Sequence, residues 1–253
     1  MNKKYVIASF ISLLLFIIPS FVFAIGAEVS LGMWQQDPTG YFSYKGEQLS
    51  VDNELRYDTE TKLLARAKID MPLFIPNIYL MYSPMDFDGN GIKTNSFKFG
   101  DVTFQANIPF KSELELNQYD IALYYGIPFL NTLSAGILNV EAGLNCKIID
   151  FYGKIEQPDL SLSESKSTTI PIPMVYLGVQ VKPIKWITIE AEGRGVAYSG
   201  NGYYDLIGRV KIHPFGPLFL SGGYRYEKIK IDYSDVDSDI EIAGPFVELG
   251  VSF

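Results

Sequence analysis

The chain has 253 residues with 29 acidic and 21 basic side chains, so its formal net charge is −8. This acidic balance argues against nucleic acid as a partner, because nucleic-acid binding needs a basic face. The single cysteine, Cys146, excludes an internal disulfide and is expected to pack as an apolar side chain. A chain of this length is sufficient for one β-barrel domain.

Residues 1–24 have the pattern of a cleaved signal peptide. Lys3 and Lys4 precede an apolar run over residues 5–18, and Ala24 is a small residue where a signal peptidase reads. We predict cleavage after Ala24, which leaves residues 25–253 as one mature domain. An uncleaved transmembrane anchor is disfavoured because the apolar run is shorter than the roughly 20 residues that cross hydrocarbon.

Hydrophobic residues beyond the leader alternate with polar ones, and no apolar run is long enough for a transmembrane helix. Such alternation is typical of membrane-spanning strands of about 10 residues, apolar on the lipid face and polar on the lumen face. Ten segments show it, and they lie at residues 27–34, 63–70, 76–83, 119–125, 138–147, 175–181, 187–195, 205–212, 218–227 and 247–253.

The connections between these segments alternate in length, as expected when both termini face the periplasm. Tight Pro-bearing turns are predicted at 72–76, 126–135, 183–185 and 213–217, and longer polar loops at 37–60, 87–112, 155–168, 199–202 and 233–239. Residues 99–110 are interpreted as part of a hairpin above the membrane, because one more barrel strand would make the count odd. The predicted fold is all-β, a transmembrane antiparallel up-and-down barrel of about ten strands, with eight or twelve as alternatives, in the bacterial outer membrane.

A soluble β-sandwich could carry the same alternation, but the polar face is charged in nearly every segment. The opposite face holds Gly, Ala, Val, Leu and Ile, with Tyr and Trp near segment ends, as at a membrane interface. The predicted lumen carries seven basic and nine acidic residues, namely Arg66, Lys68, Lys147, Arg194, Arg209, Lys211, Arg225, Glu28, Asp70, Asp120, Glu141, Glu190, Glu192, Asp205, Glu227 and Glu248.

Nearly balanced charges in a narrow barrel favour a paired, filled interior, since a wide aqueous channel is expected only at about 16–18 strands. Two interpretations follow, a structural barrel with a polar plug and a narrow channel for small solutes. A third is a surface-binding barrel that acts through loops 37–60 and 155–168.

The final segment ends on an aromatic residue, Phe253, which shares one face with Val247, Leu249 and Val251. A closing strand that ends in Phe is the recurrent terminal pattern of outer-membrane barrels. We therefore predict that Phe253 is needed by the barrel-assembly machinery, and that its strand pairs with the one starting at Ala27 so that no edge stays open.

Four stretches carry a resemblance, GAEVSLGMWQQDPTG at 26–40, IPNIYLMYSP at 75–84, LNQYDIALYYGIP at 116–128 and GPFVELGVSF at 244–253. With these stretches the chain resembles a family of small, largely uncharacterised Gram-negative outer-membrane β-barrel proteins. The resemblance implies the fold, the location, and outer-membrane lipid and lipopolysaccharide as surroundings. It implies no reaction and no functional residues.

Candidate chemistry is sparse. The single histidine, His213, lies in a predicted periplasmic turn with no nucleophile nearby, so we expect no catalytic residue, no cofactor and no enzyme. An outer-membrane enzyme that modifies lipid or peptide through a carboxylate pair is the remaining alternative. Asp86, Asp88 and Asn90 match the first positions of a calcium loop, but Phe97 occupies the position of its bidentate Glu, so these residues are a weak metal candidate beside a plain hairpin turn.

Overall fold

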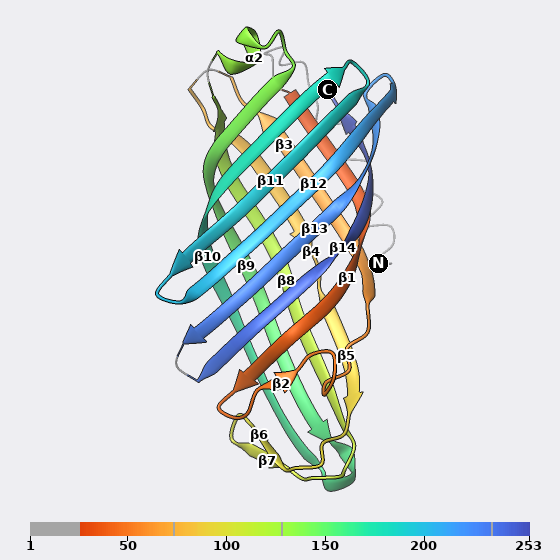
Figure 1. Cartoon of the computed structure of the whole chain (residues 1–253), viewed down its shortest axis with the longest axis vertical. Helices are drawn as coiled ribbons and strands as arrows, with labels where there is room; N and C mark the ends of the chain where they lie inside the picture. The colour runs from red at the N-terminus through yellow and green to blue at the C-terminus, as the bar shows by residue number, and fades with distance from the viewer. Residues whose placement is uncertain (1–25, 73, 128, 234) are drawn as a thin grey trace, which may run out of the picture.

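The computed structural model describes residues 26–72, 74–127, 129–233 and 235–253, so the predicted leader and Ala24 lie outside the described residues. Its barrel strands are β1 (Gly26–Tyr44), β3 (Glu60–Asp70), β4 (Asn77–Ser83) continued by β5 (Asp86–Gly91), β8 (Phe110–Gly126), β9 (Leu138–Gln157), β10 (Leu162–Ile184), β11 (Ile187–Tyr198), β12 (Asn201–Phe215), β13 (Leu218–Tyr233) and β14 (Val236–Ser252) (Figure 1). Because β4 and β5 both pair with β8, they occupy one position in the wall, and the barrel has ten strands as predicted.

Closure of the barrel joins its first and last strands. Strands β1 and β14 pair antiparallel, with Val29 opposite Val251. At the margin, the Phe253 N–H donates to the Ala27 carbonyl at 2.8 Å, and the Ala27 N–H donates to the Phe253 carbonyl at 3.2 Å. The predicted pairing of these strands is confirmed, and every strand of the wall has a neighbour on each side over its membrane-level part, as hydrocarbon requires.

The two faces of the wall have the predicted polarity. Apolar side chains cover the outside, where Leu31, Leu177 and Leu249 are 58%, 56% and 61% exposed. The charged residues predicted for the lumen point inward and most are buried. Because so wide an apolar exterior needs a lipid partner, the barrel is a transmembrane one. No helix within the described ranges is both long and apolar enough to cross a bilayer.

One end of the barrel, which we call the turn end, carries Gly26, Phe253 and four connections. Three of these are short, but the predicted tight turn at 126–135 is wrong, because this connection contains the helix α2 (Leu130–Leu133) (Figure 1). Short connections and termini of outer-membrane barrels lie in the periplasm, so the opposite end faces outside.

The predicted outer loops are mostly strand. Strands β9 and β10 continue to a three-residue 3-10 turn at Pro158–Leu160, so the predicted loop at 155–168 is a hairpin. Short turns also replace the loops predicted at 199–202 and 233–239, and β1 extends through the first part of 37–60. The reason is that polar strands pair equally well in water, so alternation with lipid-facing residues marks only the membrane-level part of each strand.

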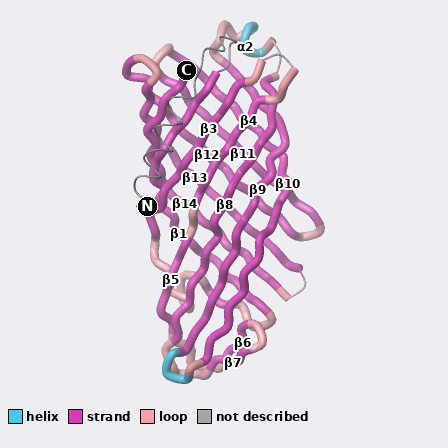
Figure 2. Tube along the Cα trace, turned by 180° about the vertical axis from the view of Figure 1, so that it is seen from behind, coloured by secondary structure: helices cyan, strands magenta, loops and turns pink. Residues whose placement is uncertain are grey.

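Two segments, residues 45–59 and 92–109, fold over the outer end and form what we call the cap. It contains β2 (Leu49–Ser50), β6 (Phe97–Phe99) and β7 (Val102–Phe104). Strands β6 and β7 form a separate two-stranded sheet, so the prediction that residues 99–110 add no strand to the barrel is confirmed. Seen from behind in Figure 2, β8, β9 and β10 run the length of the barrel to reach the cap.

Deletion of Phe253 is expected to impair assembly of the barrel into the outer membrane while leaving export intact, because its backbone hydrogen bonds with Ala27 complete the closing seam. Heat-modifiable migration of the membrane-fraction protein measures assembly, and periplasmic accumulation measures export. Normal heat-modifiability of the deletion variant would contradict this role for the residue.

Candidate functional site

A cluster of paired charges fills the middle of the lumen. Arg225 contacts Asp205 through two hydrogen bonds of 2.9 Å, and its guanidinium stacks 4.3 Å from the Trp34 ring centroid. The Lys147 ammonium lies 3.2 Å from Asp205 and 3.1 Å from Glu227. Bidentate and multiply bonded pairs of this kind satisfy charges that burial has removed from water.

A second group of charges lies nearer the turn end and continues the cluster. Arg209 bridges Glu192 at 3.1 Å and Glu248 at 3.7 Å. Arg194, also against Glu192, lies 4.5 Å from the centroid of the Tyr79 ring. We call the two groups together the plug. Its large side chains are almost fully buried, so the plug closes the lumen at this level.

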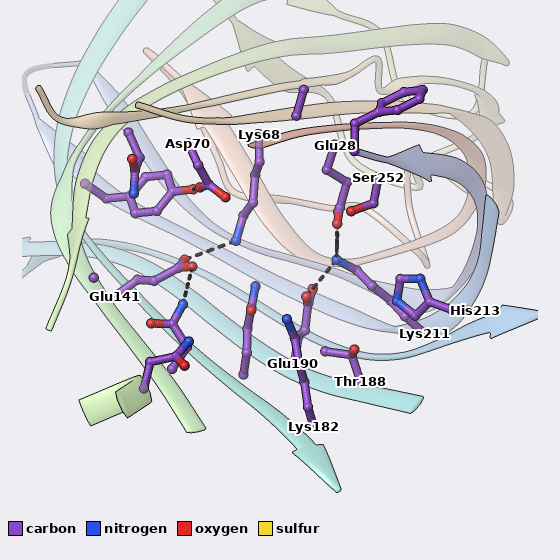
Figure 3. Close-up of a pocket in the computed structure, with 18 residues that line it drawn as sticks. Glu28, Lys68, Asp70, Glu141, Lys182, Thr188, Glu190, Lys211, His213 and Ser252 are labelled. Atoms are coloured by element: carbon purple, nitrogen blue, oxygen red, sulfur yellow. Dashed lines mark hydrogen bonds and ion pairs between the residues drawn. The ribbon is translucent and has the colours of Figure 1, made fainter. Parts of the chain in front are cut away.

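On the turn side of the plug the lumen opens into a polar vestibule of about 310 Å³. Figure 3 shows Lys211 between Glu28 and Glu190, and Lys68 reaching Glu141. The charges of the vestibule are therefore largely paired with one another. His213 lies at its margin, where the imidazole packs against Phe219 with ring centroids 5.7 Å apart.

On the outer side of the plug the lumen becomes apolar. A cavity of about 110 Å³, which we call the chamber, is lined by Phe42, Tyr44, Leu116, Ile149, Phe151, Lys166, Thr168, Ile170, Ile172, Ile229, Ile231, Val236, Ser238 and Ile240. These residues come from β1, β8, β9, β10, β13 and β14. An apolar chamber within a charged lumen is the feature that sets this barrel interior apart.

The boundary between plug and chamber follows from strand alternation. Side chains two residues apart share a face, and on several strands the inward position changes from polar to apolar in one step. Lys147 is followed on β9 by Ile149, and Glu227 is followed on β13 by Ile229. The plug therefore forms the floor of the chamber.

The cap forms its roof. Phe99 of β6 packs on Phe42 with ring centroids 6.0 Å apart and on Tyr44 at 5.7 Å. Phe42 in turn contacts Phe151 at 5.7 Å. The β6–β7 hairpin is anchored at this point because the Gly100 N–H donates to the Tyr44 carbonyl at 2.9 Å. Aromatic packing thus separates the chamber from water above.

The segment considered for metal binding is a strand rather than a loop or a turn. Asp86, Asp88 and Asn90 alternate along the exposed face of β5, while Gly89 lies against the backbone of Leu55. Side chains two apart on a strand are separated by about 7 Å along it, whereas a calcium loop brings its oxygens round one point. Asp86 instead pairs with Lys62. No group of three or more His, Cys, Asp or Glu residues in the described chain could hold a metal ion.

Sequence reasoning identified the charges of the plug but missed the chamber. The available signal was the continued alternation beyond the predicted strand ends, at Ile149 and Phe151 on β9 and at Ile229 and Ile231 on β13. Those inward positions are apolar on both strands, which indicates a lumen that changes character towards the outside.

No family model matches the sequence, and no curated protein matches it. The chain is similar in structure to the outer membrane protease OmpT from Escherichia coli (13% identity, 94% of this chain and 99% of that chain, TM-score 0.47). It is also similar to the translocator domain of the autotransporter NalP from Neisseria meningitidis (12%, 99% and 95%, 0.46) and to the attachment invasion locus protein Ail of Yersinia pestis (11%, 89% and 99%, 0.40).

The class of the protein rests on its own structure. The chain forms a closed antiparallel barrel of ten strands with an apolar exterior and a charged interior, and three of the four connections at the end that carries Gly26 and Phe253 are short. This chain is an integral β-barrel protein of the bacterial outer membrane.

Replacing Lys147 by Met is expected to lower the free energy of unfolding by about 3–5 kcal/mol, because Asp205 and Glu227 lose a buried partner. The control is Lys228→Met, whose pairs with Asp239 and Glu241 are partly exposed and contribute about 0–1 kcal/mol. Urea unfolding in phospholipid vesicles, followed by tryptophan fluorescence, measures the free energy of unfolding of both variants. Equal losses in the two variants would show that the plug does not stabilise the barrel.

Proposed function

We propose that this protein is a non-enzymatic outer-membrane barrel that binds a small apolar molecule in the chamber. One observation carries the proposal, namely an almost wholly apolar cavity in a lumen that is otherwise charged. Binding sites for small molecules are typically concave and apolar with a few polar groups. Here Lys166, Thr168 and Ser238 supply the polar margin.

The size of the chamber limits the ligand. Its volume of about 110 Å³ is somewhat below the roughly 150 Å³ of apolar protein cavities that take up benzene. A ligand of one aromatic ring or a short branched alkyl group fits this space. Four of the six contributing strands, β9, β10, β13 and β14, bring isoleucine side chains from several directions, so apolar contacts replace water over much of the ligand.

The plug weighs against the narrow-channel interpretation. A solute passing along the lumen would have to separate Lys147 and Arg225 from Asp205, and breaking such buried pairs costs several kcal/mol. We therefore propose that the lumen does not conduct. The barrel-assembly machinery and lipopolysaccharide remain predicted partners, and the outer hairpins remain the alternative surface for binding.

Among the residues that the structure describes, no nucleophile and base are arranged as an enzyme would need them. His213 lies in the periplasmic vestibule against Phe219, far along the barrel from the chamber. The carboxylates of the plug are paired with Arg and Lys, which supports a structural role.

Purified protein inserted into planar bilayers is expected to show no single-channel conductance steps, because the plug closes the lumen. The control is an Arg194→Ala, Arg225→Ala double variant, which removes two large plug side chains and is expected to conduct. Steady conductance of the unmodified protein would favour the channel interpretation.

Toluene is expected to bind the chamber saturably in lipid nanodiscs. Isoleucine-methyl NMR measures this binding, because the methyl resonances of Ile229 and Ile240 should shift to a plateau as the toluene concentration rises. Lipid-facing Ile121 and Ile189, which are 44% and 47% exposed, should respond only in proportion to toluene dissolved in the lipid.

The chamber-filling variant Ile149→Trp should abolish the saturable response of the remaining chamber isoleucines. Leu144→Trp is the matched control, because it places the same ring on the lipid face of the same strand, where Leu144 is 71% exposed. Heat-modifiable migration confirms that both variants fold. Unchanged saturable binding in Ile149→Trp would refute the chamber as the site.

A further inference from the structure

On one side of the barrel, the hydrogen bonds between neighbouring strands stop before the outer end. Strand β10 pairs with β9 over its whole outer part, as far as Leu162 opposite Gln157. Its pairing with β11 begins only at Val175 opposite Gly195. Residues 162–174 of β10 therefore have a strand partner on one edge only, within the described part of the chain. We call the space between this edge and the β11–β13 strands the seam.

The strands on the far side of the seam turn back early. Strands β11 and β12 meet in a short turn between Tyr198 and Asn201, and β13 and β14 meet between Tyr233 and Val236. In Figure 1 both hairpins end at the lower left, while β8, β9 and β10 continue down to the cap.

Pro173 explains why the β10–β11 pairing stops at Val175. Proline has no N–H to donate to a neighbouring strand. The β9–β10 register runs unbroken through Pro171 and Pro173, so the edge that lacks donors is the one towards β11. If the β10–β11 register continued by two residues, Pro173 would lie opposite Ala197. Because Pro173 has no N–H, it could not donate a hydrogen bond to Ala197.

The seam is hollow and apolar, and it adjoins the chamber. A cavity of about 120 Å³ lies in it, lined by Ile172, Val196, Tyr198, Asn201, Gly202, Tyr203, Lys230 and Ile231. Two of these residues, Ile172 and Ile231, also line the chamber. The two cavities are therefore adjacent, and the side chains that line both of them form the boundary between them.

On its other side the seam adjoins the lipid-facing surface. A shallow hollow of about 360 Å³ lies on the outer face of β10, β11 and β12, where Gly193, Gly195 and Ala197 leave space beside larger residues. Val196 lines both this hollow and the seam cavity. Leu177 and Leu206, which are 56% and 51% exposed, place the hollow on the apolar belt.

The level of the seam matches the outer membrane interface. Tyr204 opposes Gly195 at the end of the β10–β11 pairing and is 43% exposed, and Tyr198 at the hairpin tip is 82% exposed. Exposed tyrosines of this kind mark the headgroup region. Unpaired backbone is tolerated there, whereas it is excluded from the hydrocarbon core.

We propose that the seam is a lateral route through which the chamber exchanges its ligand with the outer leaflet. The ligand is then a small apolar molecule dissolved in the membrane, and not one taken from water through the cap. This inference rests on the proposed chamber binding. It is carried by three adjoining apolar hollows that lead from the lipid-facing surface to the chamber.

The route is tested by filling the seam without touching the chamber. In Val196→Trp, toluene affinity should stay unchanged, while the rate of exchange at the Ile229 and Ile240 methyl groups falls by about tenfold or more, since a blocked path slows arrival and departure alike. Val210→Trp, on the lipid face of β12 where Val210 is 44% exposed, is the size-matched control and should exchange at the normal rate.

A second variant closes the seam with no bulky ring. Pro173→Val restores a backbone donor opposite Ala197, so it should extend the β10–β11 pairing, protect the amide at position 173 from hydrogen exchange, and slow toluene exchange at unchanged affinity. Phe99→Ala, which opens the roof, should leave the exchange rate as it is.

The outcomes separate the route from the site. Normal exchange in both Val196→Trp and a protected Pro173→Val variant overturns the lateral route and leaves chamber binding standing. Exchange accelerated by Phe99→Ala and unaffected by the seam variants would assign the route to the cap. Absence of saturable binding in the unmodified protein would overturn both proposals, and loss of affinity in both seam variants would make the seam part of the site instead of a path to it.

Discussion

The pairing of Lys147 and Arg225 with Asp205 and Glu227 is the interaction on which the interior depends. An exterior that faces lipid forces charged side chains into the lumen, and burial of each ion costs several kcal/mol unless it is paired and hydrogen-bonded. The plug meets this requirement with ion pairs of 2.9–3.2 Å and with aromatic faces over the guanidinium groups. By filling the lumen at one level, it also divides the lumen into a polar vestibule and an apolar chamber.

Above the plug, the requirement for lipid-facing residues ends and the wall becomes asymmetric. Strands β8, β9 and β10 continue towards the cap, while the β11–β12 hairpin ends after Tyr198. Pro173 lies where this asymmetry begins, and its missing N–H ends the pairing of β10 with β11. This proline and the early end of the β11–β12 hairpin together determine where the barrel wall opens, and the chamber lies behind that opening.

The sequence predicted the membrane-level part of the barrel because two independent constraints act there. Around Ile121 and Asp120, or Leu144 and Lys147, one face must suit lipid and the other must suit a narrow lumen, so strict alternation results. Beyond the membrane, the outer face no longer has to suit lipid, so this constraint on the sequence is absent. Residues 163–169 of β10 are mostly polar and exposed. For this reason the sequence predicted a loop where the structure has a hairpin.

The chamber could not be predicted from one strand because its lining comes from six. Ile149, Ile170 and Ile240 are far apart in sequence, and only the closed topology brings them together. The segment around Asp88 was misread for a related reason. Its Asp, Asn and Gly residues have turn-like composition, yet Gly89 and Gly91 serve to let the cap backbone approach β5, a contact distant in sequence.

The energetic cost of each path to the chamber differs in a way that favours the seam. Axial passage from the periplasm must break buried ion pairs of the plug. Passage through the cap must displace Phe99 from Phe42 and Tyr44, and with it the Gly100–Tyr44 hydrogen bond. Along the seam no ladder hydrogen bond has to break, because the β10–β11 pairing has already ended at Val175. Only side chains such as Ile172 and Ile231 need to change rotamer, and such motions are fast compared with strand separation.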